Sequence, residues 1–407
     1  MASYPFYRAS AAQAQALGRV PNLPNANIGL WFTRFYDGFE APDWKIKPES
    51  KRGFIDATVQ LADKQGTTGK ACLELMAKRQ KNLCEALGGV CRTLRTSAPL
   101  LTGSVLSHPV ENGFTFHPTL GVPYLPASGV KGVLRAWVEV WSDLPEDERQ
   151  RRIAHWFGAA KGTEGLPENQ PEQAGALIFF DALPLDWMRL RCDILTPHMG
   201  KWYEQGGEIG SSNFAEVAPG DWYSPVPSPF LVVDRGASFL FGIAPRCTGD
   251  AQQDALAREA AGEAMETLLL ALEWAGYGAK TAAGYGVMQR DGAREQKLNE
   301  ACAEDRRQLA EKEQQQQREI AKTHMSPADR AMADLFDQRA DKNQDERTVL
   351  FSALKAGKLN EHRIQAAERL CALMQQQKRW REKSEKKNPD KDSLYQDTLL
   401  VKKWLAP

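Results

Sequence analysis

The amino-acid sequence changes character near residue 291, and this change limits the possible folds more than any other feature. Before it, glycine, proline and aromatic residues are frequent, and short apolar runs such as 176–185 and 237–245 are bounded by turn residues, as is typical of strands. After it, residues 292–320 contain almost no glycine and are rich in Gln, Glu, Arg and Lys, which predicts a long polar helix. The chain is therefore expected to combine a mixed α and β part with a helical extension.

Strand and helix patterns alternate in the part before residue 291. In chain order they predict a strand near 92–101, a helix at 128–141, strands at 176–185 and 190–198, strands at 228–234 and 237–245, a helix at 255–276 and a strand at 285–289. The order strand, helix, strand, strand, helix, strand is that of a ferredoxin-like fold, here with long insertions. Such a fold presents an open antiparallel sheet with helices on one side, as in RNA-recognition modules.

The predicted fold class is α+β, with three parts along the chain. An N-terminal segment at 1–90 is expected to pack on the core, and a ferredoxin-like domain spans 91–291. An all-α extension at 292–407 follows, in which shorter amphipathic stretches predict a small helical bundle. Within the central domain, residues 199–229 are expected to form a long irregular insertion.

Composition excludes several classes of protein. Lys plus Arg and Asp plus Glu both number 52, so a surface that binds nucleic acid must be a local patch. The 7 cysteines form no C-x-x-C pair, and with 6 scattered histidines they give no zinc-site spacing, so neither a metal nor another cofactor is expected. No apolar run approaches the roughly eighteen residues of a membrane span, and the N-terminus lacks the pattern of a secretion signal. We expect a cytoplasmic protein without a membrane partner.

A glycine-rich segment, GYGAKTAAGYG at 276–286, lies between the predicted long helix and the last strand. A Walker A loop needs lysine directly after glycine, but Ala279 intervenes here, and Thr281 stands where a dinucleotide fingerprint needs glycine. No nucleotide is therefore expected. Glycines let a backbone approach a ligand closely and turn its N–H groups toward it, which would suit a phosphodiester strand with Lys280 as a point charge. A tight turn needed only for folding is the alternative.

A second segment, PASGVKGVLR at 126–135, begins the first predicted helix. Ser128 is placed as its N-cap, and Lys131 and Arg135 lie one turn apart on the same face. A helix N-terminus with nearby cations can bind an anion. An ordinary capped helix with a solvated basic face is the alternative.

Together the two segments resemble the signatures of the RAMP superfamily of CRISPR effector proteins. The helix start is similar to the family pattern P-x-S-S-x-K-G-x-x-R and departs from it at Gly129, where a second serine is usual, while the glycine-rich segment shows no departure. The stretches 25–39, 116–132, 192–203 and 221–233 resemble the RAMP subunits of the type III-B (Cmr) complex. The resemblance covers roughly 25–290 and does not extend to the tail.

The resemblance implies a non-catalytic RNA-binding scaffold within an RNA-guided, RNA-targeting complex of antiviral defence, bound toward the 3′ end of the guide. The expected partners are CRISPR guide RNA, target RNA and other Cmr-type RAMP subunits. The candidate RNA-binding residues are Ser128, Lys131, Arg135, His198, Lys201, Gly276, Gly278, Lys280, Thr281, Gly284, Tyr285 and Gly286.

Two other classes of function stay open. A metal-independent endoribonuclease would use His198 as a general base, with Lys201 and Tyr203 nearby to steady a phosphate. A purely protein-binding assembly subunit would use the tail, whose basic cluster at 378–387 is otherwise a solvated helix face. The aromatic residues of 199–229 would pack on RNA or on a neighbouring subunit, or only hold a surface loop in place. Three further acidic residues are weak candidates for cleavage of target RNA: Asp181, Asp193 and Asp221.

Overall fold

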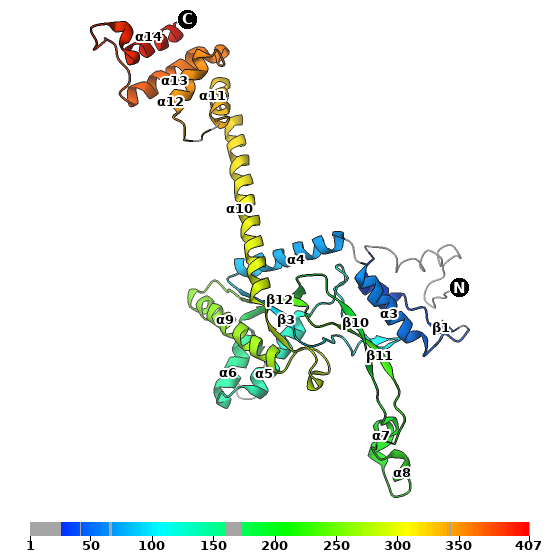
Figure 1. The fold of residues 1–407 in the computed structure, drawn as a ribbon. Coiled ribbons are helices and arrows are strands. Elements are labelled where there is room, and N and C mark those ends of the chain that lie inside the picture. Colours follow the sequence, from blue (N-terminus) through cyan, green and yellow to red (C-terminus); the bar gives the residue numbers. More distant parts are fainter. Residues whose placement is uncertain are drawn as a thin grey trace. The chain divides into compact units, whose positions relative to one another are not determined.

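A computed structural model gives the fold of this chain and describes residues 26–40, 42–64, 67–159, 172–220, 222–339, 341 and 343–406. The chain divides into two compact units between Cys302 and Ala303 (Figure 1). The first is mixed α and β and the second is helical, so the predicted combination of an α+β part and a helical C-terminal part is confirmed. None of the helices within the described ranges is long and apolar enough to span a bilayer.

A single antiparallel sheet organises the first unit. Its strands lie in the order β13-β3-β12-β8, and the short strand β9 also pairs with β12. Helix α5 joins β3 to the part of the chain that holds β8, and helix α9 joins β12 to β13. The bounds are β3 Val90–Thr96, α5 Ala127–Trp141, β8 Leu177–Phe179, β9 Leu183–Pro184, β12 Ser238–Pro245, α9 Ala251–Trp274 and β13 Met288–Arg290.

Helices α5 and α9 cover one face of this sheet (Figure 1). Asp250 starts α9 by accepting hydrogen bonds from the N–H groups of Gln252 and Gln253. Small side chains along the buried side of α9, such as Ala261 and Ala264, let the helix lie close to the strands. The apolar side chains of β12 that face these helices, Phe239 and Phe241 among them, form the main core.

The opposite face of the sheet is covered as well, at its centre. Helix α4 (Thr67–Ala86) packs on β12 and β3, and the beginning of helix α10 (Gly292–Thr323) joins it. Leu240 of β12 is buried among Ala77 of α4 and Leu298 of α10. All eight residues of β12 are therefore buried. The expectation of a sheet open on one side was wrong, because α4 and α10 supply apolar side chains to the second face.

The segment before β3 contributes to the main core. Helices α2 (Ile28–Arg34) and α3 (Ser50–Asp63) bury Trp31, Phe32 and Phe54. His108 stacks on Phe32 with ring centroids 4.2 Å apart, and its Nε2–H donates to the Phe32 carbonyl over 2.7 Å. Burial lowers the pKa of His108, which keeps the ring neutral. His108 is therefore a structural residue.

Residues 199–229 are more regular than expected. The antiparallel hairpin β10 (Leu190–Leu195) and β11 (Ser228–Val233) brackets them, and two short helices lie between its strands (Figure 1). The helices are α7 (Gly200–Gln205) and α8 (Phe214–Val217), with a 3-10 turn at Gly206–Glu208. Local burial of Val217 and Ala218 accounts for this order. The first unit also contains helix α6 (Glu146–Phe157) and three two-stranded sheets. In these sheets β1 (Phe39–Glu40) pairs with β2 (Lys45–Ile46), β4 (Ser107–His108) pairs with β5 (Glu111–Asn112), and β6 (Gly158–Ala159) pairs with β7 (Gln173–Ala174).

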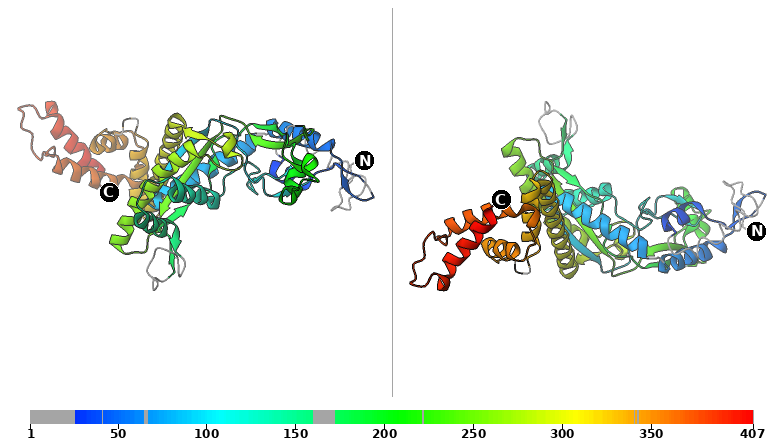
Figure 2. Two further views of the ribbon diagram at one scale, coloured as in Figure 1. Left: turned by 90° about the horizontal axis from the view of Figure 1, so that it is seen from below. Right: turned by 90° about the horizontal axis from the view of Figure 1, so that it is seen from above.

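The second unit is a small helical bundle with its own core (Figure 2, orange to red). Met332, Leu350, Leu370 and Val401, from four different helices, are buried in it. Its helices are α11 Pro327–Asp337, α12 Glu346–Lys355, α13 Arg363–Gln376 and α14 Ser393–Leu405, with 3-10 turns at Asn360–His362 and Pro389–Lys391.

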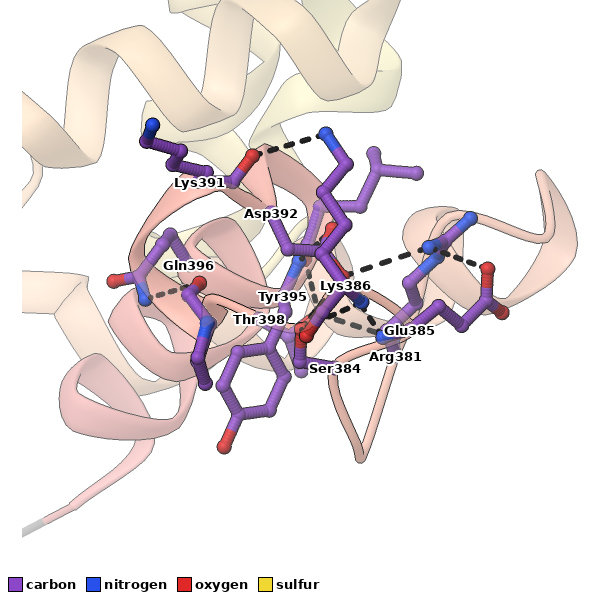
Figure 3. A network of polar contacts seen from close by, with 11 residues as sticks. Arg381, Ser384, Glu385, Lys386, Lys391, Asp392, Tyr395, Gln396 and Thr398 are labelled. Atoms are coloured by element: carbon purple, nitrogen blue, oxygen red, sulfur yellow. Dashed lines mark hydrogen bonds and ion pairs between the residues drawn. The ribbon is translucent and has the colours of Figure 1, made fainter.

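The basic cluster at 378–387 lies in a loop between α13 and α14, so its interpretation as a helix face was wrong. The carboxylate of Asp392, 2% exposed, organises this loop (Figure 3). It accepts hydrogen bonds from Ser384 Oγ and from the Glu385 N–H, both over 3.1 Å, and caps α14 through the Tyr395 N–H. These contacts replace helical hydrogen bonds that the backbone of this segment would otherwise make.

The division between the units lies inside α10, not at the change of composition at 291. Arg294 donates to the Leu185 carbonyl over 3.1 Å and pairs with Asp186, while Leu298 and Cys302 are buried against the sheet. Farther along the helix, Leu309 is 58% exposed. The first turns of α10 therefore belong to the first unit because they bury side chains there, although their composition resembles that of the tail.

Leu298→Ala should lower the free energy of unfolding by about 2 kcal/mol or more, because it leaves a cavity beneath α10. Leu309→Ala, an exposed leucine of the same helix, is the matched control and should change it by no more than about 0.5 kcal/mol. Urea unfolding of both variants measures the difference. Equal effects would contradict the packing of α10 on the sheet.

Candidate nucleic-acid interface

The helix start at 126–135 and the glycine-rich segment at 276–286 lie against each other in the fold. The contact is between Gly129 and Tyr277: a Cβ built on Gly129 would lie 2.0 Å from the Tyr277 hydroxyl and 2.9 Å from Cζ. Tyr277 is only 6% exposed, and burial raises the pKa of its phenol. Tyr277 thus occupies the space that a side chain at 129 would need, which explains why glycine stands where the RAMP pattern usually has serine.

The start of α5 differs from the expectation. Pro126 is the N-cap residue, and Ser128 is the second residue of the helix, with an exposed side chain. The first helical amide, that of Ala127, donates to Asp181 Oδ1 over 2.7 Å. The prediction that Ser128 caps the helix was therefore wrong, because a carboxylate from a distant segment satisfies the first amide.

The two cations of α5 make different contacts. Lys131 Nζ donates to the Phe157 carbonyl over 3.1 Å, which links α5 to the end of α6. Arg135 Nε donates to Glu139 Oε1 over 2.7 Å on the exposed side of the helix. Ion pairs with this exposure stabilise a helix only slightly. Arg135 is therefore available to a ligand phosphate at little cost, whereas Lys131 also holds two helices together.

The glycine-rich segment is a closed loop tied by hydrogen bonds to residues 99–101, which follow β3. Its Ala279 N–H donates to the Leu101 carbonyl and its Gly286 N–H to the Pro99 carbonyl, both over 2.8 Å. Lys280 has φ +62°, in the left-handed region, and Thr281–Ala283 form one 3-10 turn. As predicted, the loop follows a helix and enters a strand.

The glycines of this loop have two different roles. A Cβ added to Gly278 would lie 2.2 Å from the Leu101 carbonyl oxygen. A Cβ added to Gly286 would lie 1.9 Å from the Tyr277 carbonyl oxygen, and one added to Gly276 would lie 2.9 Å from the Tyr285 carbonyl oxygen. At these three positions the backbone closely approaches the protein itself. Gly284 has φ +85° and no atom within 4 Å of its Cβ position, so only its conformation favours glycine.

Lys280 and Tyr285 both lie over the hairpin formed by β10 and β11. The Lys280 ammonium lies 5.4 Å from the centre of the Phe230 ring, a cation–π contact. The Tyr285 hydroxyl donates to Asp193 Oδ2 over 2.8 Å, and burial, followed by this carboxylate, raises its pKa. The side chain of Tyr285 therefore contacts the protein itself and is half-buried, and Thr281 of the same loop is half-buried as well.

An open groove of about 450 Å³ lies where α5 and the glycine-rich loop meet. Its walls are the loop after β3, the exposed side of α5 and the start of the glycine-rich loop: Thr102–Val105, Gly129, Gly132, Val133, Ala136 and Tyr277–Ala279. Val105 is 93% exposed at its rim. None of these lining residues carries a charge, so the groove offers backbone and small side chains, with Arg135 on the adjacent turns of α5.

Neither His198, which lies between β10 and α7, nor Lys201, which lies in α7, is among these lining residues. His198 Nδ1 is 3.3 Å from the Thr196 carbonyl, and Lys201 Nζ is 3.9 Å from a carboxylate oxygen of Glu216. The structure thus brings the helix start and the glycine-rich loop together but leaves these two residues on the hairpin. Local sequence patterns do not indicate the wall at Thr102–Val105, apart from the glycine at 103, whose φ is +74°.

Comparisons with known proteins agree with the motifs. The model of the RAMP superfamily matches residues 93–289. The CRISPR system Cmr subunit Cmr6 of Pyrococcus furiosus is 27% identical over 250 residues, covering 50% of this chain and 69% of that protein. The crystal structure of Cmr6 from Pyrococcus furiosus is 25% identical, covering 50% of this chain and 98% of that one, with a TM-score of 0.29. A chain in the cryo-EM structure of the type III-B Cmr-beta complex bound to cognate target RNA is 21% identical, covering 59% of this chain and 71% of that one, with a TM-score of 0.40.

Gly129→Ala should destabilise the first unit by about 1–3 kcal/mol, because the new methyl group overlaps Tyr277 in a packed interior. Gly132→Ala in the same helix has nothing within 4 Å of its Cβ position. It should stabilise the protein by about 0.5–1 kcal/mol through helix propensity alone. Melting temperatures of the two variants test this difference, and a stabilising Gly129→Ala would show that Tyr277 moves aside freely.

Gly278→Ala should cost clearly more stability than Gly284→Ala. Both replace a glycine of positive φ, at a cost of roughly 1–2 kcal/mol, but only Gly278→Ala adds an overlap with the Leu101 carbonyl. Chemical denaturation of both variants gives the comparison. Equal losses of stability in the two variants would mean that the loop does not pack on residues 99–101, which follow β3.

Proposed function

Because this chain is a RAMP superfamily protein homologous to the Cmr6 subunit of type III-B Cmr complexes, we propose that it is a non-catalytic RNA-binding scaffold in such a complex. In this role it binds the guide RNA toward its 3′ end and packs against other RAMP subunits, in a complex that targets RNA in antiviral defence. CRISPR guide RNA and target RNA are its nucleic-acid partners, and neither a nucleotide nor a cofactor is required.

The observation that carries this proposal is the meeting of the two RAMP-like segments at Gly129 and Tyr277. They lie far apart in the sequence, yet they line one groove together with the loop after β3. Both fall within the residues that match the RAMP superfamily model. A site built from both signatures supports a family function more strongly than either segment alone.

The sheet order supports assigning this domain to the ferredoxin-like class. Numbered along the chain, strands β3, β8, β12 and β13 are the first to the fourth, so the order β13-β3-β12-β8 is fourth, first, third, second. Helices follow the first and third of these strands. The ferredoxin-like plan has this alternation of strands and helices.

The chemistry of the groove suits RNA that is held by its shape and its phosphates. Such recognition needs backbone groups, hydroxyls and a few cations, and no catalytic constellation. Ser128 offers an exposed hydroxyl, and Arg135 offers a guanidinium whose present partner is a weak surface ion pair. Lys280 contributes a charge within the glycine-rich loop, and the open surface at Gly284 leaves room for an RNA strand to approach the backbone.

The acidic residues considered for RNA cleavage have structural contacts that support a non-catalytic role. Asp181 holds the first amide of α5, and Asp193 accepts the Tyr285 hydroxyl and pairs with Arg191 over 3.1 Å. Asp221 lies outside the described residues. His198, the general base of the alternative endoribonuclease, sits on the hairpin between β10 and α7 and does not line the groove.

The double variant Arg135→Gln and Lys280→Gln should weaken binding of single-stranded RNA and reduce the salt dependence of the affinity. Each lost phosphate contact removes roughly 0.7 from the slope of log K against log salt, so the loss should be about 1.4. The matched control is Arg151→Gln with Arg258→Gln, which removes two exposed cations of the same unit. Fluorescence anisotropy across a salt series measures both. An unchanged slope in the first variant, or an equal loss in the control, would contradict the site.

Incubation of the protein with labelled RNA, with and without magnesium, should show no cleavage. His198→Ala should behave identically, because no catalytic step depends on this histidine. Single-turnover cleavage by the unaltered protein that is lost in His198→Ala would replace the scaffold by the endoribonuclease.

A further inference from the structure

Three arginines from three separate segments surround a second hollow, of about 470 Å³, at one end of the sheet. Arg95 belongs to β3, Arg235 to the turn between β11 and β12, and Arg290 to the end of β13. Thr96, Ser97 and Gln289 complete most of its wall. None of these residues belongs to the groove between α5 and the glycine-rich loop.

The hollow exists because α4 and the start of α10, which cover the centre of the second sheet face, do not extend over this end of the sheet. Thr93 pairs with Leu240 in the ladder, beneath Leu298 of α10, and both are buried. Arg95 lies two residues farther along β3, on the same face of the sheet. Its register partners are Ser238 in β12 and Gln289 in β13, and its side chain is exposed. In RNA-recognition modules the open sheet face holds the nucleic acid. Here this end of the face is open, and it carries guanidinium groups in place of aromatic rings.

The arginines that line the hollow outnumber its carboxylates, since Arg95, Arg235 and Arg290 share the lining with one acidic residue, Asp291. Arg290 is 3.3 Å from Glu295, whose carboxylate also accepts the Thr93 N–H. Asp291 accepts hydrogen bonds from the Ser238 hydroxyl over 2.7 Å and from the Arg294 N–H over 3.1 Å. Among the residues that the structure describes, no carboxylate lies within 4.0 Å of the guanidinium of Arg95 or of Arg235. Two cations thus share a hollow whose acidic groups are already engaged.

Gly236 lies beside the side chain of Arg95 and directly follows Arg235 in the chain. It has φ +95°, and its Cβ position lies 3.2 Å from Nη2 of Arg95, so the guanidinium of Arg95 lies against the turn that carries Arg235. The turn is fixed to β3, because the Gly236 N–H donates to the Thr96 carbonyl over 2.7 Å and the Ala237 N–H to Thr96 Oγ1 over 3.0 Å. Neighbouring guanidinium groups repel each other unless an anion lies between them, and their planar forks suit phosphate oxygens.

The hollow and the glycine-rich loop lie along one continuous stretch of backbone. The Ser97 N–H donates to the Val287 carbonyl over 3.0 Å, and the hydrogen bonds at Pro99 and Leu101 continue this pairing into the loop. Leu101 lies six positions after Arg95, a path of at most about 22 Å along the chain. A single strand of RNA that crosses the loop is therefore long enough to reach the arginines within a few nucleotides.

We propose that Arg95, Arg235 and Arg290 form a binding site for a phosphate group, and that the phosphate is a phosphodiester of the RNA strand that crosses the glycine-rich loop. The source of the phosphate rests on the proposed function, whereas the site itself rests on the arginines alone. Arg95 and Arg235 bind the phosphate oxygens through their guanidinium forks. Arg290 adds positive charge while it keeps its contact with Glu295.

The test compares the full-length protein with Arg95→Gln plus Arg235→Gln, and with the charge-matched control Arg151→Gln plus Arg258→Gln. Binding of single-stranded RNA across a salt series should lose about 1.4 from its slope in the first variant, at roughly 0.7 for each contact, and nothing in the control. An equal slope in the unaltered protein and the first variant, or an equal loss in the control, would overturn the assignment to RNA.

Inorganic phosphate separates failure of this site from failure of the proposed function. If the unaltered protein binds no RNA, the scaffold proposal fails, and melting temperature in a phosphate titration then decides the site. If phosphate raises the melting temperature of the unaltered protein and of the control but not of Arg95→Gln plus Arg235→Gln, the arginines bind a phosphate group that comes from a ligand other than RNA. The same response in all three proteins would overturn it.

Discussion

Strand β12 is buried along its whole length, and this burial decides where a ligand can reach the sheet. Phe239 and Phe241 face the helices α5 and α9, while Leu240 faces α4 and the start of α10. An RNA strand cannot lie across the centre of such a sheet without displacing one of these layers. The places that remain are the ends of the strands, where the groove beside Gly129 and the hollow beside Arg95 both lie. The proposed contacts with RNA therefore follow from how the core is covered.

The glycine-rich loop combines folding and proposed binding in one segment. Gly278 and Gly286 allow the backbone to pass close to carbonyl groups of the protein itself, and Tyr277 fills the space beside Gly129. These contacts give the loop one conformation without any ligand. A preorganised loop of this kind loses little conformational entropy when a nucleic-acid strand binds to it. Stability and affinity are consequently coupled at Gly278, whereas Gly284 and Lys280 are positions where they can be separated.

The second unit is stabilised independently of the sheet. Leu350 and Leu370 belong to its own core, and the buried carboxylate of Asp392 orders the loop between α13 and α14. That loop holds the basic cluster at 378–387 in a fixed arrangement instead of leaving it on a helix face. The residues matched by the RAMP superfamily model end at 289, so the family match does not reach this unit.

The sequence by itself determined the main strands and the two long helices between residues 90 and 290, the change to polar helix after residue 291, and the two RAMP-like segments. These features depend on local patterns: periodicity, glycine spacing and short motifs. Only the tertiary structure decided that α4 and Leu298 cover the second sheet face, that Asp181 in place of Ser128 satisfies the first amide of α5, and that Tyr277 fills the space at Gly129. It also decided that Arg95 and Arg235 line the same hollow. Periodicity shows that a side chain is buried but not which distant segment buries it, because contacts between residues far apart in the chain leave no local pattern.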